Sequence, residues 1–172
     1  MGACYSVQFK IRIEEGCEDR LFKELKNIIE MGDKEGKVNF NLDKVKQNGN
    51  NLETYLDLLK VFFSTCSKPA KDITIESDRC LSYNNDFDAS YGWIDIMEYV
   101  IHTIAEYLDD YSHFYIEADN DSVIYVIADG KVYEFKPCTN DIDELDKKLS
   151  DPNNDEVKSD DDPIITKIKE ND

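Results

Sequence analysis

The residues best placed to do chemistry form an acidic row within residues 91–110. Asp95, Glu98, His102, Glu106 and Asp109 recur at spacings of three and four, so a helix over this segment would carry them on one side. Such a row of carboxylates with one histidine could bind a basic protein, hold a metal ion or form a solvated helix face.

The row fits a metal site poorly. Di-iron carboxylate sites draw ligands from several facing helices and place a histidine three residues after a glutamate. Here His102 follows Glu98 by four residues, and His113, the only other histidine, falls on a predicted strand. The row is more typical of a solvated helix face, and we expect no metal and no cofactor.

Catalytic signatures are absent from the sequence. It contains no G-x-S-x-G, Walker A, G-x-G-x-x-G or H-E-x-x-H motif. We therefore expect no enzymatic activity. The alternative is an unrecognised catalytic site at His102 or His113, which a pocket joining either histidine to an acid from another element would support.

The hydrophobic pattern predicts the elements that position these residues. Residues 5–13 alternate apolar and polar side chains, as a strand with one buried face does. Helical spacing is present in 17–31, in 52–63 with Asn51 as N-cap, in 91–110 with Ser90 as cap, and in 141–149. Further strands are predicted at 73–75, 113–118, 123–128 and 131–136. Asp119–Asp121 and Asp129–Gly130 are predicted to form the hairpin turns between the last three. Residues 83–90 are predicted to form a polar loop, and residues 38–42 a short strand or loop.

This order of elements predicts an α+β fold. We expect a mostly antiparallel sheet of about five strands with three main helices packed on one face. Residues 1–149 form one domain, and residues 150–172 form an acidic C-terminal tail.

The strand at 123–128 is apolar on both faces, so something must cover the face that the main helices leave open. The C-terminal segment could do so through apolar residues at Ile142, Leu145, Ile164, Ile165 and Ile168. The alternative is a partner or a second copy of the chain, with Tyr115 and Tyr125 as contacts, because tyrosine is enriched at interfaces.

The charge is large and unevenly distributed. The chain has 172 residues and a net charge of −18. Residues 1–71 carry 11 acids and 12 bases, whereas residues 72–136 carry 15 acids and three bases, and residues 137–172 carry 12 acids and five bases. This excess disfavours direct binding to nucleic acid or to an anionic membrane.

The cellular compartment follows from the cysteines and the N-terminus. The number of cysteines, five, is odd, and none of them has the spacing of a metal-binding motif. No secretory signal precedes the first predicted strand. These observations predict reduced thiols and a cytoplasmic protein.

The leading functional hypothesis is a non-enzymatic module that binds a basic protein. The acidic row would share its surface with Glu117, Asp119 and Asp121. A narrower version is an inhibitor that occupies the nucleic-acid groove of an effector or nuclease, analogous in charge alone to immunity and anti-CRISPR proteins. The row spans roughly 21 Å, over which a duplex places about 12 charges, so four carboxylates do not imitate DNA alone. The alternative from another class is a structural module or homodimer that uses the apolar sheet face.

Overall fold

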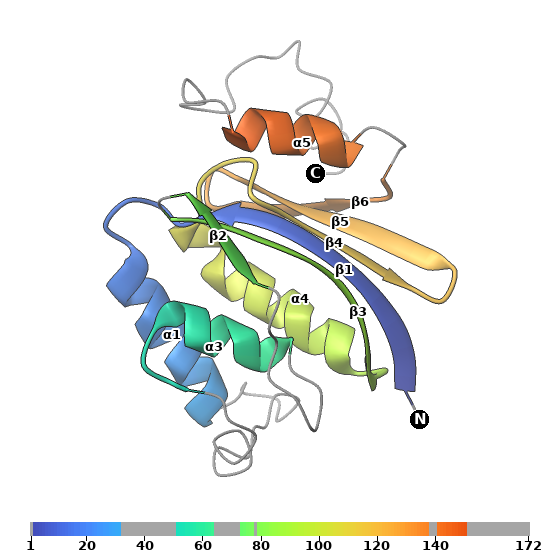
Figure 1. Ribbon diagram of the computed structural model, residues 1–172, viewed down its shortest axis with the longest axis horizontal. Coiled ribbons are helices and arrows are strands. Elements are labelled where there is room, and N and C mark those ends of the chain that lie inside the picture. Colours follow the sequence, from blue (N-terminus) through green and yellow to red (C-terminus); the bar gives the residue numbers. More distant parts are fainter. Residues whose placement is uncertain (1, 32–50, 64–72, 78, 138–140, 151–172) are drawn as a thin grey trace.

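The computed structural model describes residues 2–31, 51–63, 73–77, 79–137 and 141–150. In these ranges the elements are β1 (Gly2–Arg12), α1 (Glu18–Met31), α3 (Tyr55–Phe62), β2 (Thr74–Ser77), β3 (Cys80–Ser90), α4 (Trp93–Ile104), the 3-10 turn η1 (Ala105–Tyr107), β4 (His113–Ala118), β5 (Asp121–Ala128), β6 (Lys131–Phe135) and α5 (Asp141–Ser150). The strands form one six-stranded sheet in the order β2-β3-β1-β4-β5-β6 (Figure 1), and every neighbouring pair is antiparallel. The predicted α+β class is confirmed.

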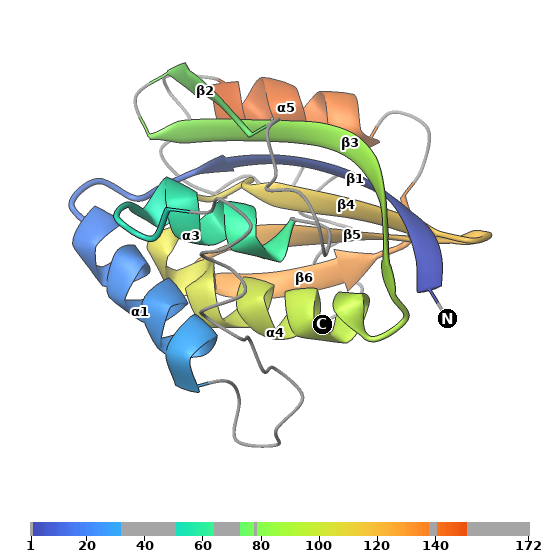
Figure 2. The ribbon, with the colours of Figure 1, turned by 60° about the horizontal axis from the view of Figure 1, so that its bottom comes forward.

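The sheet separates two layers of helices. Helices α1, α3 and α4 lie on one face, which we call the inner face, and α5 lies on the opposite, outer face (Figures 1 and 2). The predicted packing of three main helices on one face is therefore confirmed. No helix in the described ranges is long and apolar enough to cross a bilayer.

The alternation in the first strand sets the inner core. Tyr5, Val7, Phe9 and Ile11 are buried on the inner face, while the residues between them face outward and are less buried. The partners of β1 on both sides place further aromatic rings into the same layer. Phe9 lies across from Tyr83 on one side and from Phe114 on the other, and its ring lies 5.4 Å from each of theirs. This layer is the floor on which α1, α3 and α4 pack.

The predicted polar loop at 83–90 is wrong, because these residues are part of β3. All eleven residues of β3 pair with β1, from Cys80 opposite Arg12 to Ser90 opposite Gly2. Its inward side chains, Leu81, Tyr83 and Phe87, are buried, while Asn84, Asp86 and Asp88 point away from the core. These three polar residues are thus the wet face of a long strand, whereas Asn85 is exposed but alternates with the inward Tyr83 and Phe87.

Helix α4 is shorter than predicted. It begins at Trp93 after Gly92 and not directly after Ser90, and no side chain caps its first turn. It ends at Ile104, after which η1 tightens the backbone and Leu108 is extended. The predicted acidic row therefore divides: Asp95, Glu98 and His102 lie on α4, whereas Glu106 lies on η1 and Asp109 lies beyond it.

The contact between α3 and α4 fixes where both helices meet the sheet. Thr54 caps α3 by a capping box with Asp57, in place of the predicted Asn51. The buried indole Nε1 of Trp93 donates to the carbonyl of Phe62 at 2.7 Å. That bond satisfies a carbonyl at the end of α3, where the helix offers no internal partner.

Helix α5 covers the apolar outer side of β5 and β6. Leu145 and Leu149 are fully buried against Ile124, Val126 and Phe135, and Ile142 packs beside them. The predicted cover by the C-terminal segment is confirmed for Ile142 and Leu145. The other residues named for this cover (Ile164, Ile165 and Ile168), the tail at 150–172 after its first residue, and the segment at 38–42 lie outside the described residues.

Candidate functional site

The candidate site is a hollow at the end of α4 where carboxylates from three parts of the chain meet. It has a volume of about 510 Å³. We call it the acidic hollow, and its lining is Glu14, Glu106, Leu108, Asp109, Asp110, Asp129 and Gly130. Five of these seven residues are acids, and none is basic.

Backbone hydrogen bonds bring the first two parts together. Beyond β1, Ile13 forms an isolated bridge with Leu108. The amide of Glu14 donates to the carbonyl of Tyr107 at 2.9 Å, and the amide of Asp109 donates to the carbonyl of Arg12 at 2.8 Å. Main-chain bonds therefore hold Glu14 beside Asp109, although 95 positions separate them in the sequence.

The β5–β6 turn supplies the third part. Asp129 and Gly130 both have positive φ, at 53° and 69°, as the two central residues of a type I′ hairpin turn require. The amide of Asp129 donates to the carboxylate Oδ1 of Asp110 at 2.7 Å. A Cβ on Gly130 would lie 3.8 Å from the Cα of Glu106, so the turn packs against η1 at van der Waals distance.

Asp109 is a carboxylate of the hollow whose pKa is raised. Burial raises its pKa from the usual value, and the nearby charges of Glu14 and Asp110 act in the same direction. Arg12 and Arg79 lower it but do not overcome the burial. The ionised form of Asp109 therefore lacks full compensation, as expected for a group that a cation from outside could stabilise.

A second group of acids lies outside the hollow and acts on two tyrosines. Asp95 is exposed and Glu98 half-buried. Both raise the pKa of Tyr125, as does Glu134 on β6, although burial of the phenol is the largest cause. Asp95 and Asp119 likewise both act on Tyr5, whose pKa is raised chiefly by burial. Among the described residues, no ion pair includes any of these acids, which are Asp95, Glu98, Asp119 and Glu134.

The structure corrects the role of Tyr125 and separates other predicted contacts. Tyr125 is only 3% exposed and packs in the inner core, so it cannot be a surface contact. Tyr115 lies on the outer face, where its hydroxyl donates to Glu117, and that bond raises its pKa. Asp121 pairs with Lys136 at 3.2 Å. Glu117 and Tyr115 therefore do not share the surface of Asp95 and Glu98.

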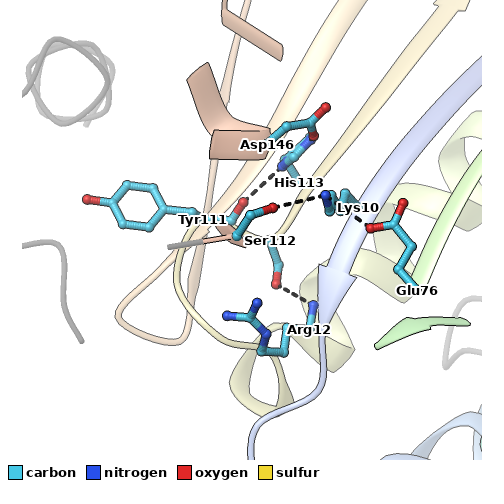
Figure 3. Close-up of polar contacts among 8 residues, drawn as sticks. Lys10, Arg12, Glu76, Tyr111, Ser112, His113 and Asp146 are labelled. Carbon is cyan, nitrogen blue, oxygen red and sulfur yellow. Dashed lines mark hydrogen bonds and ion pairs between the residues drawn. The ribbon is translucent and has the colours of Figure 1, made fainter. Parts of the chain in front are cut away.

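The two histidines have different environments. His102 is exposed on α4. His113 is 2% exposed, and its Nε2 lies 3.0 Å from Oδ1 of Asp146 on α5 (Figure 3). His113 and Asp146 line a groove of about 350 Å³ beside α5, together with polar residues of β1, β2 and β3.

This groove is the pocket that the enzyme alternative requires, since it joins a histidine to an acid from another element. However, the Nδ1 of His113 lies 2.9 Å from the carbonyl of Tyr111, so both ring nitrogens already have partners. A general base needs a nitrogen that a substrate can reach. The pair is therefore better suited to holding α5 than to catalysis.

Sequence reasoning identified two of the five acids of the hollow, Glu106 and Asp109. It missed Glu14, Asp110 and Asp129. The sequence predicts Asp129 in a hairpin turn, but nothing in the local sequence indicates that this turn packs against η1. Glu14 and Asp146 reach their partners through strand pairing and helix docking, which single-sequence periodicity does not specify. In the described ranges, no group of three or more histidine, cysteine or acidic residues could hold a metal ion.

Comparison with protein-family models, with curated proteins and with solved structures finds no match to this chain.

Proposed function

We propose that this protein is a binding module for a basic protein, and that the acidic hollow receives a lysine or arginine side chain of that partner. The observation that carries the proposal is the lining of the hollow, where five carboxylates from three parts of the chain meet with no base among them. Asp95 and Glu98 add further negative charge on α4.

The hollow is suited to a cation for a second reason. Burial raises the pKa of Asp109, so its charged form is under-compensated. A guanidinium or ammonium group placed in the hollow would favour that charged form and lower this pKa. Binding would then release a proton from those molecules in which Asp109 is protonated, and the affinity would increase as Asp109 ionises.

The shorter α4 favours discrete side-chain recognition over imitation of a duplex. A 12-residue helix is roughly 18 Å long, over which a duplex presents about ten charges. Of the predicted row, only Asp95 and Glu98 supply carboxylates on that helix. Occupation of a nucleic-acid groove in an effector or nuclease is the narrower version of the proposal, and it would need the hollow to supply the remaining charge.

The main alternative explanation is that the net charge of −18 attracts any basic protein without a specific site. Two variants with the same loss of charge distinguish the two. The hollow variant is Glu14→Gln, Glu106→Gln and Asp129→Asn; asparagine tolerates the positive φ at position 129. The control variant is Asp86→Asn, Asp88→Asn and Asp143→Asn, three exposed acids on β3 and α5.

The experiment captures basic partners from the native cell and measures the affinity of each captured protein for the three forms over a range of salt. The proposal predicts that affinity falls with salt and that the hollow variant loses at least about tenfold more affinity than the control. Equal losses in the two variants would assign the binding to bulk charge. Binding indifferent to salt, or retained by Asp95→Lys with Glu98→Lys and Glu106→Lys, would also refute the proposal. Competition between a captured protein's nucleic acid and this chain tests the narrower inhibitor version.

The oligomeric alternative relies on an open apolar sheet face. In the described ranges, α5 covers the outer face of β5 and β6. Because that apolar face is already covered, it gives less reason to expect a second copy of the chain there. The mass of the protein in solution at high concentration tests it directly.

A further inference from the structure

The phenol of Tyr125 has a buried hydroxyl group that, among the described residues, has no hydrogen-bond partner. The side chain is 3% exposed, and no hydrogen bond of its hydroxyl is found in the described ranges. Other tyrosine hydroxyls on the sheet do have acceptors: Tyr5 donates to the carbonyl of Ser90, and Tyr115 donates to Glu117. A buried hydroxyl without a partner costs free energy, so the group needs a physical explanation.

Strand pairing places a carboxylate directly beside this ring. Tyr125 of β5 pairs with Glu134 of β6, and paired residues of antiparallel strands project from the same face of a sheet. Because Tyr125 belongs to the inner core, Glu134 also lies on the inner face. In the described sheet β6 is the last strand, and Glu134 is exposed there. A molecule from outside can therefore reach this carboxylate.

Helix α4 brings two further carboxylates to the same place. The helix runs beside β6 in the opposite direction (Figure 2), and the β5–β6 turn at Gly130 packs on Glu106. From Gly130, four steps along the strand lead to Glu134 over roughly 13 Å. From Glu106, two steps along η1 and six along α4 lead back to Glu98 over about the same length. Glu98 is therefore level with Glu134, and Asp95 lies one helical turn further on.

The charges around the phenol agree with this placement. Burial is the largest cause of the raised pKa of Tyr125, and the charges of Glu98, Glu134 and Asp95 follow in that order. Among the described residues, no ion pair includes any of these three acids. Lys136, two positions beyond Glu134, already pairs with another acid. The hydroxyl end of the ring thus faces carboxylates that have no cation among the described residues.

We propose that Tyr125, Glu98, Glu134 and Asp95 form a binding site for the guanidinium group of an arginine from another protein. We call it the Tyr125 site. The phenol oxygen accepts one N–H group at the bottom of the site, and the carboxylates accept others. Tyr125 is then a buried acceptor and not a surface contact. The inference goes beyond the proposed function, because this site shares no residue with the acidic hollow.

The arrangement favours a guanidinium group over a metal ion or an ammonium group. In the described ranges, no three histidine, cysteine or acidic residues could hold a metal ion, so these carboxylates do not converge on one point. A metal ion needs acceptors that surround one atom, and an ammonium group directs its three donors from one atom. A guanidinium group presents five N–H donors across a plane, which suits acceptors spread over a helix and a neighbouring strand.

Titration of the intact chain, labelled with carbon-13 at the phenol carbon of tyrosine, tests this inference by NMR. Tyr125→Phe identifies the signal of Tyr125. The probe is Nα-acetylarginine amide at low salt, compared with the neutral citrulline analogue and with Nα-acetyllysine amide. We expect a saturating shift of the Tyr125 signal with the arginine probe and none with the citrulline probe. The lysine probe should bind at least about fivefold more weakly.

Two variants with the same loss of charge test the role of the carboxylates. Glu98→Gln with Glu134→Gln should weaken the binding measured at Tyr125 by about tenfold. Asp86→Asn with Asp88→Asn, two exposed acids on the outer side of β3, should change it little. The hollow variant should also retain the shift of the Tyr125 signal, so failure of the acidic hollow and failure of the Tyr125 site are distinguishable.

Tyr125→Phe tests the unpartnered hydroxyl by a second measurement. Because this hydroxyl has no partner among the described residues, its removal should not lower the denaturant midpoint of unfolding. The same variant should bind the arginine probe about tenfold more weakly, because a hydrogen bond to a charged group is lost. This affinity is measured from the backbone amides of Glu98 and Glu134.

Several results would overturn the inference. Absence of a saturating shift, or equal shifts with the arginine and citrulline probes, would show that the site does not bind the cation. Equal affinity for lysine and arginine would exclude selection of the guanidinium group. Equal losses in the two double variants would assign the response to bulk charge, and its loss in the hollow variant would show that the site is not separate. A lower unfolding midpoint for Tyr125→Phe would show that the hydroxyl has a partner within the fold, and unchanged affinity in that variant would remove the hydroxyl from the site.

Discussion

Asp109→Asn is the substitution that best distinguishes a functional carboxylate from a structural one. Burial raises the pKa of Asp109 above its unfolded value, with Arg12 and Arg79 opposing this only in part. A raised folded-state pKa means that this group contributes stability below its unfolded pKa and that this contribution is lost as the pH rises through the folded value. At neutral pH the ionised carboxylate is therefore slightly unfavourable to the fold, and a neutral asparagine of similar shape removes that penalty.

The size of the effect is small because Asp109 is only half-buried. After allowance for screening by water, the free energy of unfolding should rise by about 0.5 kcal/mol. For a chain of this size, that corresponds to an increase in Tm of about 1–2 °C at pH 7. The gain should shrink as the pH is lowered through the range where Asp109 becomes protonated.

Thermal unfolding followed by circular dichroism at pH 7 and at about pH 4 measures the change. In parallel, the same variant should bind a basic partner more weakly, so stability and binding should move in opposite directions. A fall in Tm of several degrees at pH 7 would refute the reasoning, because it would mean that Asp109 stabilises the fold through its arginine neighbours. Unchanged binding would remove Asp109 from the site.

Three other predictions test the packing and the pKa assignments. Trp93→Phe leaves the buried carbonyl of Phe62 without its indole donor, and should lower the free energy of unfolding by about 2 kcal/mol in denaturant titrations followed by circular dichroism. Leu145→Ala removes a fully buried side chain beneath α5 and should lower it by about 2–3 kcal/mol, with the largest loss of hydrogen-exchange protection in α5; uniform loss across the sheet would contradict this. Glu117→Gln should lower the pKa of Tyr115 toward its usual value, because the hydrogen bond to Glu117 is the main cause of its raised pKa; NMR titration of the tyrosine ring carbons would show no change if that bond is absent.

The strands with clear alternation could be predicted from sequence, and the extent of the long strand β3 could not. The pattern at 5–13 predicts β1 because one face of that strand is uniformly apolar. Residues 83–90 carry Asn84, Asp86 and Asp88, which are common in loops, yet pairing with β1 makes them a strand. Such non-local pairing overrides local propensity, because eleven paired residues and three buried inward side chains outweigh the preference of asparagine and aspartate for turns.

The site was predictable only in part, for a related reason. Helical spacing identified Asp95, Glu98, Glu106 and Asp109, but α4 ends at Ile104, so the last two residues join a different group of acids. Glu14 and Asp129 reach that group through a strand bridge and a hairpin turn. The local charge could be located from sequence, whereas the concave shape that concentrates it depends on contacts between residues far apart in the chain.

Mapping where a basic ligand binds is the most direct test of the central claim. An arginine-containing peptide is titrated into the isotope-labelled protein at low salt, and the shifts of the backbone amides are recorded. If the acidic hollow is the binding site, the largest shifts fall on residues 106–110 and 129–130, and the variant Glu14→Gln, Glu106→Gln and Asp129→Asn loses them. Shifts of equal size on the exposed acids of β3 and α5, or shifts that the variant retains, would show that the negative charge attracts basic ligands without a site.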